Sequence, residues 1–178
     1  DDDWPVVRVL RLTHNVFDNL VARHHLESIL ENSAHGDAIH GRAMTALANV
    51  YSDRGEHAKA LELVGDLAGV AARIVEARAN LAMANYDQTL AICDEALAGE
   101  PEVASVAELR SILALVYYYT EQAEAALPQF EATALACEQI GDAVGQARAV
   151  NGIGLIHQRR GAFDEALASY QRSYEIAV

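Results

Sequence analysis

The chain has 178 residues, of which 52% are apolar but only 6% aromatic, and its 26 acidic and 13 basic side chains give a formal net charge of −13. This length suits one domain or one continuous array. An acidic surface repels phosphate groups, which argues against direct nucleic-acid binding. The apolar content comes mainly from Ala and Leu, with 3 prolines, and we therefore expect an all-α protein. No apolar run is long enough for a transmembrane helix.

Residues 1–36 are predicted to form an N-terminal helix pair. Asp3-Trp4-Pro5 is typical of a helix start, a short helix is expected over residues 6–12, and a turn over residues 13–15. An apolar stripe from Val16 to Leu30 predicts the second helix. The pair lacks the turn glycine found later in the chain, so it is either a degenerate repeat or a separate element. A polar joint is expected over residues 33–37.

One helix-turn-helix pattern occurs twice, around Gly55 and around Gly161. Each glycine ends a polar turn and stands between two apolar stripes with helical spacing. The two segments align at an offset of 106 (161 − 55), with matches at both large and small positions. The matched pairs are Arg42 and Arg148, Leu47 and Ile153, Ala48 and Gly154, and Ala60 and Ala166.

Two weaker copies lie between these segments. The first is predicted to turn at Ala84-Asn85-Tyr86-Asp87, and Gly99-Glu100-Pro101 then interrupts the chain. The second is predicted to turn at Thr120-Glu121-Gln122, and Pro128 is expected near the start of the helix that follows. The last spacing is long, since the corresponding small residues Ala114 and Gly154 are 40 apart.

Small residues such as Gly154, Ala166 and Ser173 recur where two helices would have to approach closely. This pattern resembles the tetratricopeptide repeat, a helix-turn-helix unit of about 34 residues. The longer spacing is similar to that of repeats in bacterial signalling proteins. The resemblance implies a right-handed α-α superhelix of about ten antiparallel helices. It places an array over residues 37–178, with repeats at about 37–69, 70–100, 101–140 and 141–178.

In this family the first helix of each pair lines the concave face, so the resemblance implies a groove for a protein or peptide segment there. Asparagine amides can both donate to and accept from an extended backbone, and tyrosines are frequent interface anchors. The groove residues predicted in this way are Arg42, Thr45, Asn49, Ser52, Glu108, Ser111, Leu115, Tyr118, Tyr119, Arg148, Asn151, Leu155 and Gln158.

The sequence contains no catalytic, cofactor-binding or metal-binding motif. Cys93 and Cys137 are interpreted as buried thiols in a reducing, cytoplasmic setting. His24, His25, His35 and His40 are interpreted as solvated. Lys59, the single lysine, maps to a second helix, which disfavours the lysine clamp for chain ends known in some family members.

The leading hypothesis is therefore a non-catalytic protein- or peptide-binding module. Because the chain begins at Asp1 without Met and stops at Val178 at the end of a repeat, we expect a sensory or scaffold segment of a larger bacterial signalling or regulatory protein. Two alternatives remain. One is homodimerisation through Tyr170, Tyr174 and Ile176 of the last helix. The other is the peptide-sensing part of a transcriptional regulator.

Overall fold

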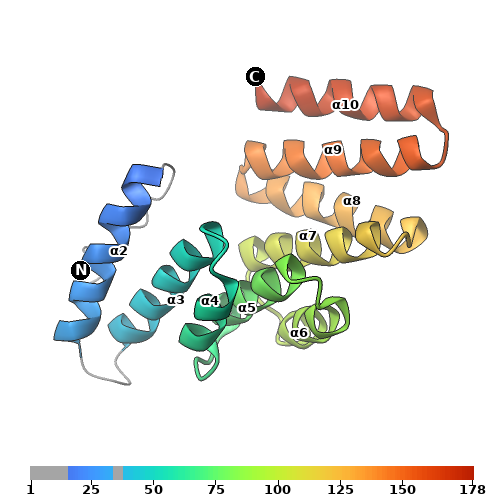
Figure 1. Ribbon diagram of the computed structural model, residues 1–178. Coiled ribbons are helices and arrows are strands. Elements are labelled where there is room, and N and C mark those ends of the chain that lie inside the picture. Colours follow the sequence, from blue (N-terminus) through green and yellow to red (C-terminus); the bar gives the residue numbers. More distant parts are fainter. Residues whose placement is uncertain (1–15, 34–37) are drawn as a thin grey trace. The chain divides into compact units, whose positions relative to one another are not determined.

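A computed structural model describes residues 16–33 and 38–178, which form nine α-helices and no strand (Figure 1). The all-α prediction is thus confirmed. The predicted helix start at Asp3, the helix over residues 6–12, the turn over residues 13–15, His35 and most of the polar joint lie outside the described residues. The helices are α2 (Val16–Asn32), α3 (Ala38–Asp53), α4 (His57–Val64), α5 (Val70–Ala82), α6 (Tyr86–Ala98), α7 (Val103–Tyr119), α8 (Ala123–Ile140), α9 (Ala143–Arg159) and α10 (Phe163–Ala177).

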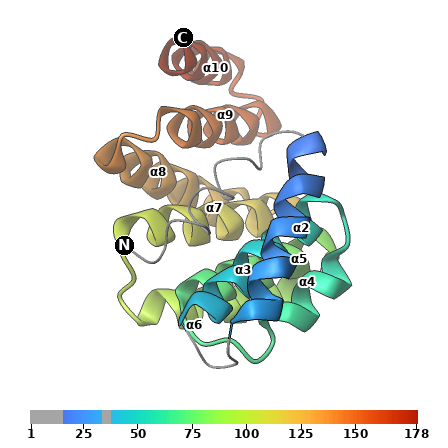
Figure 2. The same cartoon turned by 90° about the vertical axis from the view of Figure 1, so that its left-hand side faces the viewer.

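The helices form two compact units that meet in sequence after Ala84, and each is described by itself. In the first unit, α3 packs against α2, α4 and α5, and α4 also packs against α5. In the second unit, α7 packs on α6, and the helices α7, α8, α9 and α10 stack in chain order, as both views show (Figures 1 and 2). In the described part of the chain, no helix combines the length and apolar content that crossing a bilayer requires.

Each turn within a helix pair contains one residue in the left-handed backbone region. These residues are Gly55 (φ 78°), Ala84 (φ 59°), Glu121 (φ 62°) and Gly161 (φ 75°). They lie in the turns expected from the sequence, at spacings of 29 (84 − 55), 37 (121 − 84) and 40 (161 − 121). The difference follows from helix length, because α4 has 8 residues and α8 has 18.

Small residues allow the helices of the second unit to pack closely, as the sequence predicts. A Cβ atom on Gly154 would lie 2.6 Å from Cε1 of Tyr170, and one on Gly152 would lie 2.5 Å from Cε1 of Phe130. The Ser173 hydroxyl donates a hydrogen bond to the carbonyl oxygen of Ala147 at 2.7 Å. These contacts join α9 to the helices on either side of it.

Two sequence expectations are wrong. His40 is buried rather than solvated, because it lies on the inner side of α3 with Nδ1 2.9 Å from the Ser33 hydroxyl. His24 and His25 are exposed, as expected. Pro128, expected near the start of its helix, lies five residues after α8 begins at Ala123, beyond the positions where a missing N–H costs least. The helix continues through it, and the proline side chain is exposed.

Candidate functional site

A pocket of about 440 Å³ in the first unit lies between α3 and the segment that leads into α5. Three of the predicted groove residues, Arg42, Thr45 and Asn49, line it from α3. Their spacing of three and four residues puts them on one side of that helix. An apolar wall is supplied by Leu67 together with small residues such as Ala68 and Ala71. An apolar pocket with a few polar groups at its edge is the usual form of a binding site.

Arg78 of α5 holds the polar edge of this pocket in place. Its Nη1 donates to Oδ1 of Asn49 at 3.2 Å, and its Nη2 lies 3.3 Å from Oδ1 of Asp53. The amide oxygen of Asn49 therefore already accepts one hydrogen bond. The N–H donors of its amide have no partner among the described residues, so they can reach a carbonyl oxygen of a bound segment.

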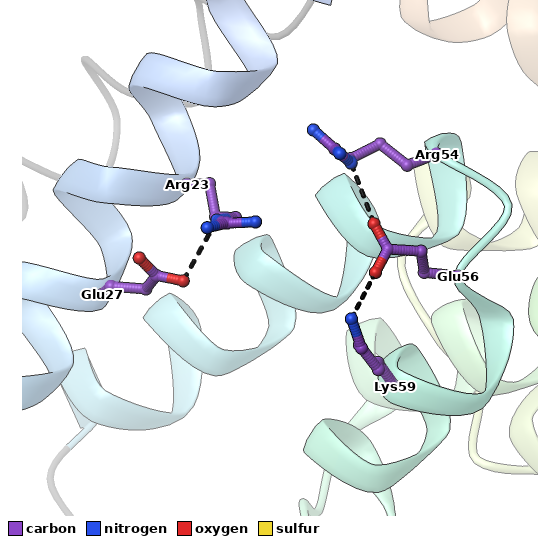
Figure 3. Close-up of polar contacts among 5 residues, drawn as sticks. All are labelled: Arg23, Glu27, Arg54, Glu56 and Lys59. Carbon is purple, nitrogen blue, oxygen red and sulfur yellow. Dashed lines mark hydrogen bonds and ion pairs between the residues drawn. The ribbon is translucent and has the colours of Figure 1, made fainter.

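Lys59 lies on α4 and contributes to a separate charged cluster at the α3–α4 turn (Figure 3). Glu56 there accepts from both Lys59 and Arg54. The hydrogen bond from Lys59, followed by that from Arg54, lowers the pKa of the Glu56 carboxyl, and the same bond raises the pKa of Lys59. Arg23 and Glu27 form a neighbouring ion pair on α2 at 3.2 Å. The lysine does not line the pocket on α3.

In the second unit, predicted residues at the end of α7 join a ladder of aromatic rings and an arginine. The rings of Tyr86 and Tyr119 have centroids 6.5 Å apart, and those of Tyr119 and Tyr118 are 5.6 Å apart. The guanidinium carbon of Arg159 lies 3.9 Å from the Tyr118 centroid, and its Nη1 donates to the Tyr118 carbonyl oxygen at 2.9 Å. Tyr118 and Arg159 also line a pocket of about 470 Å³ with Ile156.

Arg148 and Asn151 are exposed on α9, three residues apart and so on adjacent turns of one helix side. Neither side chain has a hydrogen bond, ion pair or ring contact among the described residues. The Arg148 guanidinium thus has no acidic partner among them, although acidic residues outnumber basic ones two to one in the chain. This guanidinium can donate hydrogen bonds to a carboxylate, and the neighbouring Asn151 amide can bond to a peptide backbone.

The other predicted groove residues are more constrained. The side-chain oxygen of Gln158 accepts from the Tyr170 hydroxyl at 2.6 Å, which ties it to α10. Thr45 donates to the Gly41 carbonyl oxygen at 2.9 Å. Leu115 packs against the apolar core between α7, α8 and α9. Ser52, Ser111 and Leu155 are half-buried, and Glu108 is exposed.

The three residues predicted for self-association differ in their surroundings. Tyr170 is half-buried, with its ring against Gly154, and Ile176 packs on the core between α8 and α9. Tyr174 is 70% exposed. The exposed side of α10 instead combines Tyr174 with Phe163 and Leu167, which the sequence reasoning did not include.

Sequence reasoning also missed Arg78, Ala71, Tyr86 and Arg159. A signal for the first two was available, because moving the alignment by 29 residues, from Gly55 to Ala84, matches Asn49 with Arg78 and Arg42 with Ala71. Arg159 follows the predicted Gln158 directly. Nothing in the sequence connects Tyr86 with Tyr119, since that contact depends on how α6 packs on α7.

The described side chains also include the candidates for metal binding and for thiol chemistry. No three His, Cys, Asp or Glu side chains among them converge as a metal site requires. Both cysteines are free and buried, as the sequence predicts. Burial, and next the nearby Asp94 carboxylate, raises the pKa of the Cys93 thiol to about 12. Burial also raises the pKa of Cys137, with smaller contributions from Asp142 and Glu108.

Comparison with known proteins agrees with this arrangement. Residues 105–177 match the family model of the tetratricopeptide repeat. A crystal structure of MamA is similar with a TM-score of 0.63 at 22% identity over 90% of each chain. MamA from Desulfovibrio magneticus RS-1 gives 0.67 at 14% identity, over 97% of this chain and 90% of that one. YrrB is described as a TPR protein with an unusual peptide-binding site. It is similar with a TM-score of 0.56 at 16% identity, over 97% of this chain and 84% of that one. No curated protein matches the sequence.

Proposed function

Because residues 105–177 belong to the tetratricopeptide repeat family and the chain has the fold of that family's solved structures, we propose that it is a non-catalytic module that binds an extended protein or peptide segment. One observation carries the proposal. Arg42, Thr45 and Asn49, predicted from the sequence to face a groove, line a single pocket with an apolar wall.

Each unit contributes a different kind of contact. In the first, the pocket is large enough for an apolar side chain, and the Asn49 amide can donate to the backbone beside it. In the second, Asn151 can pair with the backbone through both its donor and its acceptor, and Arg148 can pair with an acidic side chain or a chain end. The description of YrrB as peptide-binding supports this type of ligand.

The proposed context is a sensory or scaffold segment of a larger signalling protein in a reducing compartment. The turn spacing of 40 residues between Glu121 and Gly161 supports it through its similarity to the long repeats of such proteins. The two buried free thiols support the reducing compartment. A peptide-sensing part of a transcriptional regulator would use the same groove.

A peptide array probed with the wild-type chain and three variants tests the proposal. Arg148→Glu and Asn151→Ala should lose spots that the wild type retains. Arg172→Glu is the matched control, because Arg172 of α10 is also exposed and without a polar partner among the described residues. Equal binding by all four proteins would remove the α9 side chains from the site.

Self-association is the second candidate, and the 70% exposure of Tyr174 favours it. Tyr170 and Ile176 contribute less than the sequence indicated, because they pack within the unit. Light scattering over a concentration series tests this candidate. A dimer that Tyr174→Glu abolishes would support it, and a monomer at every concentration would contradict it.

A further inference from the structure

The pocket of about 470 Å³ in the second unit lies where the α7–α8 turn meets the end of α9, and two neighbouring arginines, Arg159 and Arg160, line it. Part of the lining is apolar. Ile156 is fully buried in the core between α7, α8 and α9, and Ala123 packs against the same core. A cavity that combines apolar lining with a few polar groups is the usual form of a ligand site.

The helix-turn-helix unit does not require this arginine pair. A cation at the end of a helix complements the helix dipole, but the other three pairs fill these positions differently. The two residues that precede the left-handed turn residue are Arg159-Arg160 in the last pair. In the earlier pairs they are Asp53-Arg54, Ala82-Met83 and Tyr119-Thr120. The two adjacent arginines are therefore a feature of this pocket and not of the repeat.

Arg159 is fixed in position and still has donors for a ligand. Its guanidinium carbon lies 3.9 Å from the centroid of the Tyr118 ring, and its Nη1 donates to the Tyr118 carbonyl oxygen at 2.9 Å. Its Nε and Nη2 have no partner among the described residues. These two nitrogens present parallel N–H groups along one edge of the guanidinium, which is the arrangement that binds both oxygens of a carboxylate.

Arg160 already holds a carboxylate that a ligand can replace. Its Nη2 lies 3.1 Å from Oε1 of Glu124, whose side chain is 88% exposed. An ion pair with so exposed a partner contributes little stability, so a ligand carboxylate that also bonds to Arg159 can take its place. Glu121 lines the pocket as well, and it forms no ion pair with a described residue.

We propose that this pocket binds a glutamate side chain of the peptide segment, with the carboxylate on Arg159 and Arg160 and the aliphatic stem against Ile156. The inference rests on the proposed function, because it names the class of side chain that the segment presents to the second unit. A nucleic acid or a phosphorylated side chain would bring more negative charge to a pocket that Glu121 also lines, in a chain of net charge −13. A single carboxylate brings one charge to two guanidinium groups.

A positional peptide library tests the proposal. Its members are short peptides of mixed sequence with blocked ends, and the central residue of each pool is fixed as glutamate, glutamine or phosphoserine. Capture on the immobilised wild-type chain, quantified by mass spectrometry, should favour the glutamate pool over the glutamine pool at least about fivefold, which corresponds to ~1 kcal/mol. In NMR spectra, the Nε–H resonance of Arg159 should shift when the best glutamate peptide is added and should not shift with its glutamine counterpart.

Variants locate the carboxylate. Arg159→Gln should remove the preference for glutamate, and Arg159→Lys should restore only part of it, because lysine keeps the charge but lacks the two parallel donors. Arg172→Gln is the matched control and should keep the full preference, since it makes the same charge change at an exposed arginine of α10 outside the pocket. Glu124→Gln should strengthen the preference by releasing Arg160. Glu131→Gln, at an exposed position further along α8, should not.

Several results would overturn the proposal. A glutamate preference that Arg148→Glu removes and Arg159→Gln leaves unchanged would assign the carboxylate to Arg148 and keep the proposed function. Equal loss in Arg159→Gln and Arg172→Gln would mean that net charge selects the peptides. Stronger capture of the phosphoserine pool would assign the pocket to phosphate groups.

The pools also separate this proposal from the proposed function. Equal capture of the glutamate and glutamine pools would contradict the acidic ligand alone, whereas no capture of any pool would contradict peptide binding as well. A thermal melt of Arg159→Gln equal to that of the wild type would show that a lost preference is not lost folding. If that variant melts earlier, Arg159→Lys and Glu124→Gln still decide the outcome, and an unchanged preference in both would refute the proposal.

Discussion

Gly154 at the contact between α9 and α10 gives the sharpest test of the packing. In most helices Gly→Ala is stabilising by about 1 kcal/mol, since alanine loses less backbone entropy on folding. At Gly154 the new Cβ would lie 2.6 Å from Cε1, 2.7 Å from Cδ1 and 3.2 Å from Cζ of Tyr170. The ring cannot move freely, because its hydroxyl donates to Gln158 at 2.6 Å.

Overpacking of this kind typically costs about 1–3 kcal/mol. Subtracting the helix-propensity gain leaves Gly154→Ala less stable than the wild type by about 1 kcal/mol. For a chain of this size, that loss lowers Tm by about 2–4 °C. Urea unfolding followed by circular dichroism measures the free energy of unfolding directly. The matched control is Gly41→Ala within α3, where a Cβ would lie 4.0 Å from its neighbour Leu67 Cδ2, an ordinary van der Waals distance.

The two substitutions should have opposite signs, because Gly41→Ala gains helix propensity without a clash. A double-mutant cycle makes the cause explicit. In a Tyr170→Ala background the ring that the new Cβ would meet is gone, so Gly154→Ala should become stabilising. The stability changes of two residues in contact are not expected to be additive. If Gly154→Ala destabilises the chain equally in both backgrounds, close approach to the Tyr170 ring is not the reason for the glycine.

Three further predictions concern single sites. Glu121→Gly should stabilise the chain by about 0.5–1 kcal/mol in the same urea assay, because φ is 62° there and glycine adopts that region without strain. The hydrogen bond from Lys59 lowers the pKa of Glu56. This contact therefore stabilises the fold at pH values above the ordinary carboxyl pKa, and the stabilisation is lost as pH falls through the lowered pKa of Glu56. An NMR titration should find the Glu56 pKa below the ordinary glutamate value, and Lys59→Met should raise it towards that value. With a pKa of about 12 for Cys93 and a raised pKa for Cys137, neither thiol should react with iodoacetamide at neutral pH until urea exposes both, as mass spectrometry can count.

Much of the fold could be read from the sequence because its signals are local. Gly55 and Gly161 end their turns by adopting positive φ, and the apolar stripes on either side give the helices. The turns at Ala84 and Glu121 could be placed without a glycine, since the neighbouring repeats fix where a turn must fall. The side of α3 that faces the pocket follows from the same periodicity.

The contacts that tune the candidate site could not be predicted, because they join residues distant in sequence. Arg78 of α5 donates to the amide oxygen of Asn49 on α3, 29 residues earlier, and this bond orients the asparagine side chain. The sequence suggested Tyr170 as an exposed interface residue, yet its ring packs against α9, where Gly154 makes room for it. His40 lies on the buried side of α3, and the Ser33 hydroxyl, 2.9 Å from Nδ1, gives its ring a hydrogen-bonding partner there.

The central claim is that the first helices of the pairs bind an extended segment. The most direct measurement records amide chemical shifts by NMR while the tightest peptide from the array is added. We predict that the largest changes fall on a first helix of a pair, either on α3 around Arg42 and Asn49 or on α9 around Arg148 and Asn151. Changes confined to α8 and α10, with those residues unmoved, would contradict the groove.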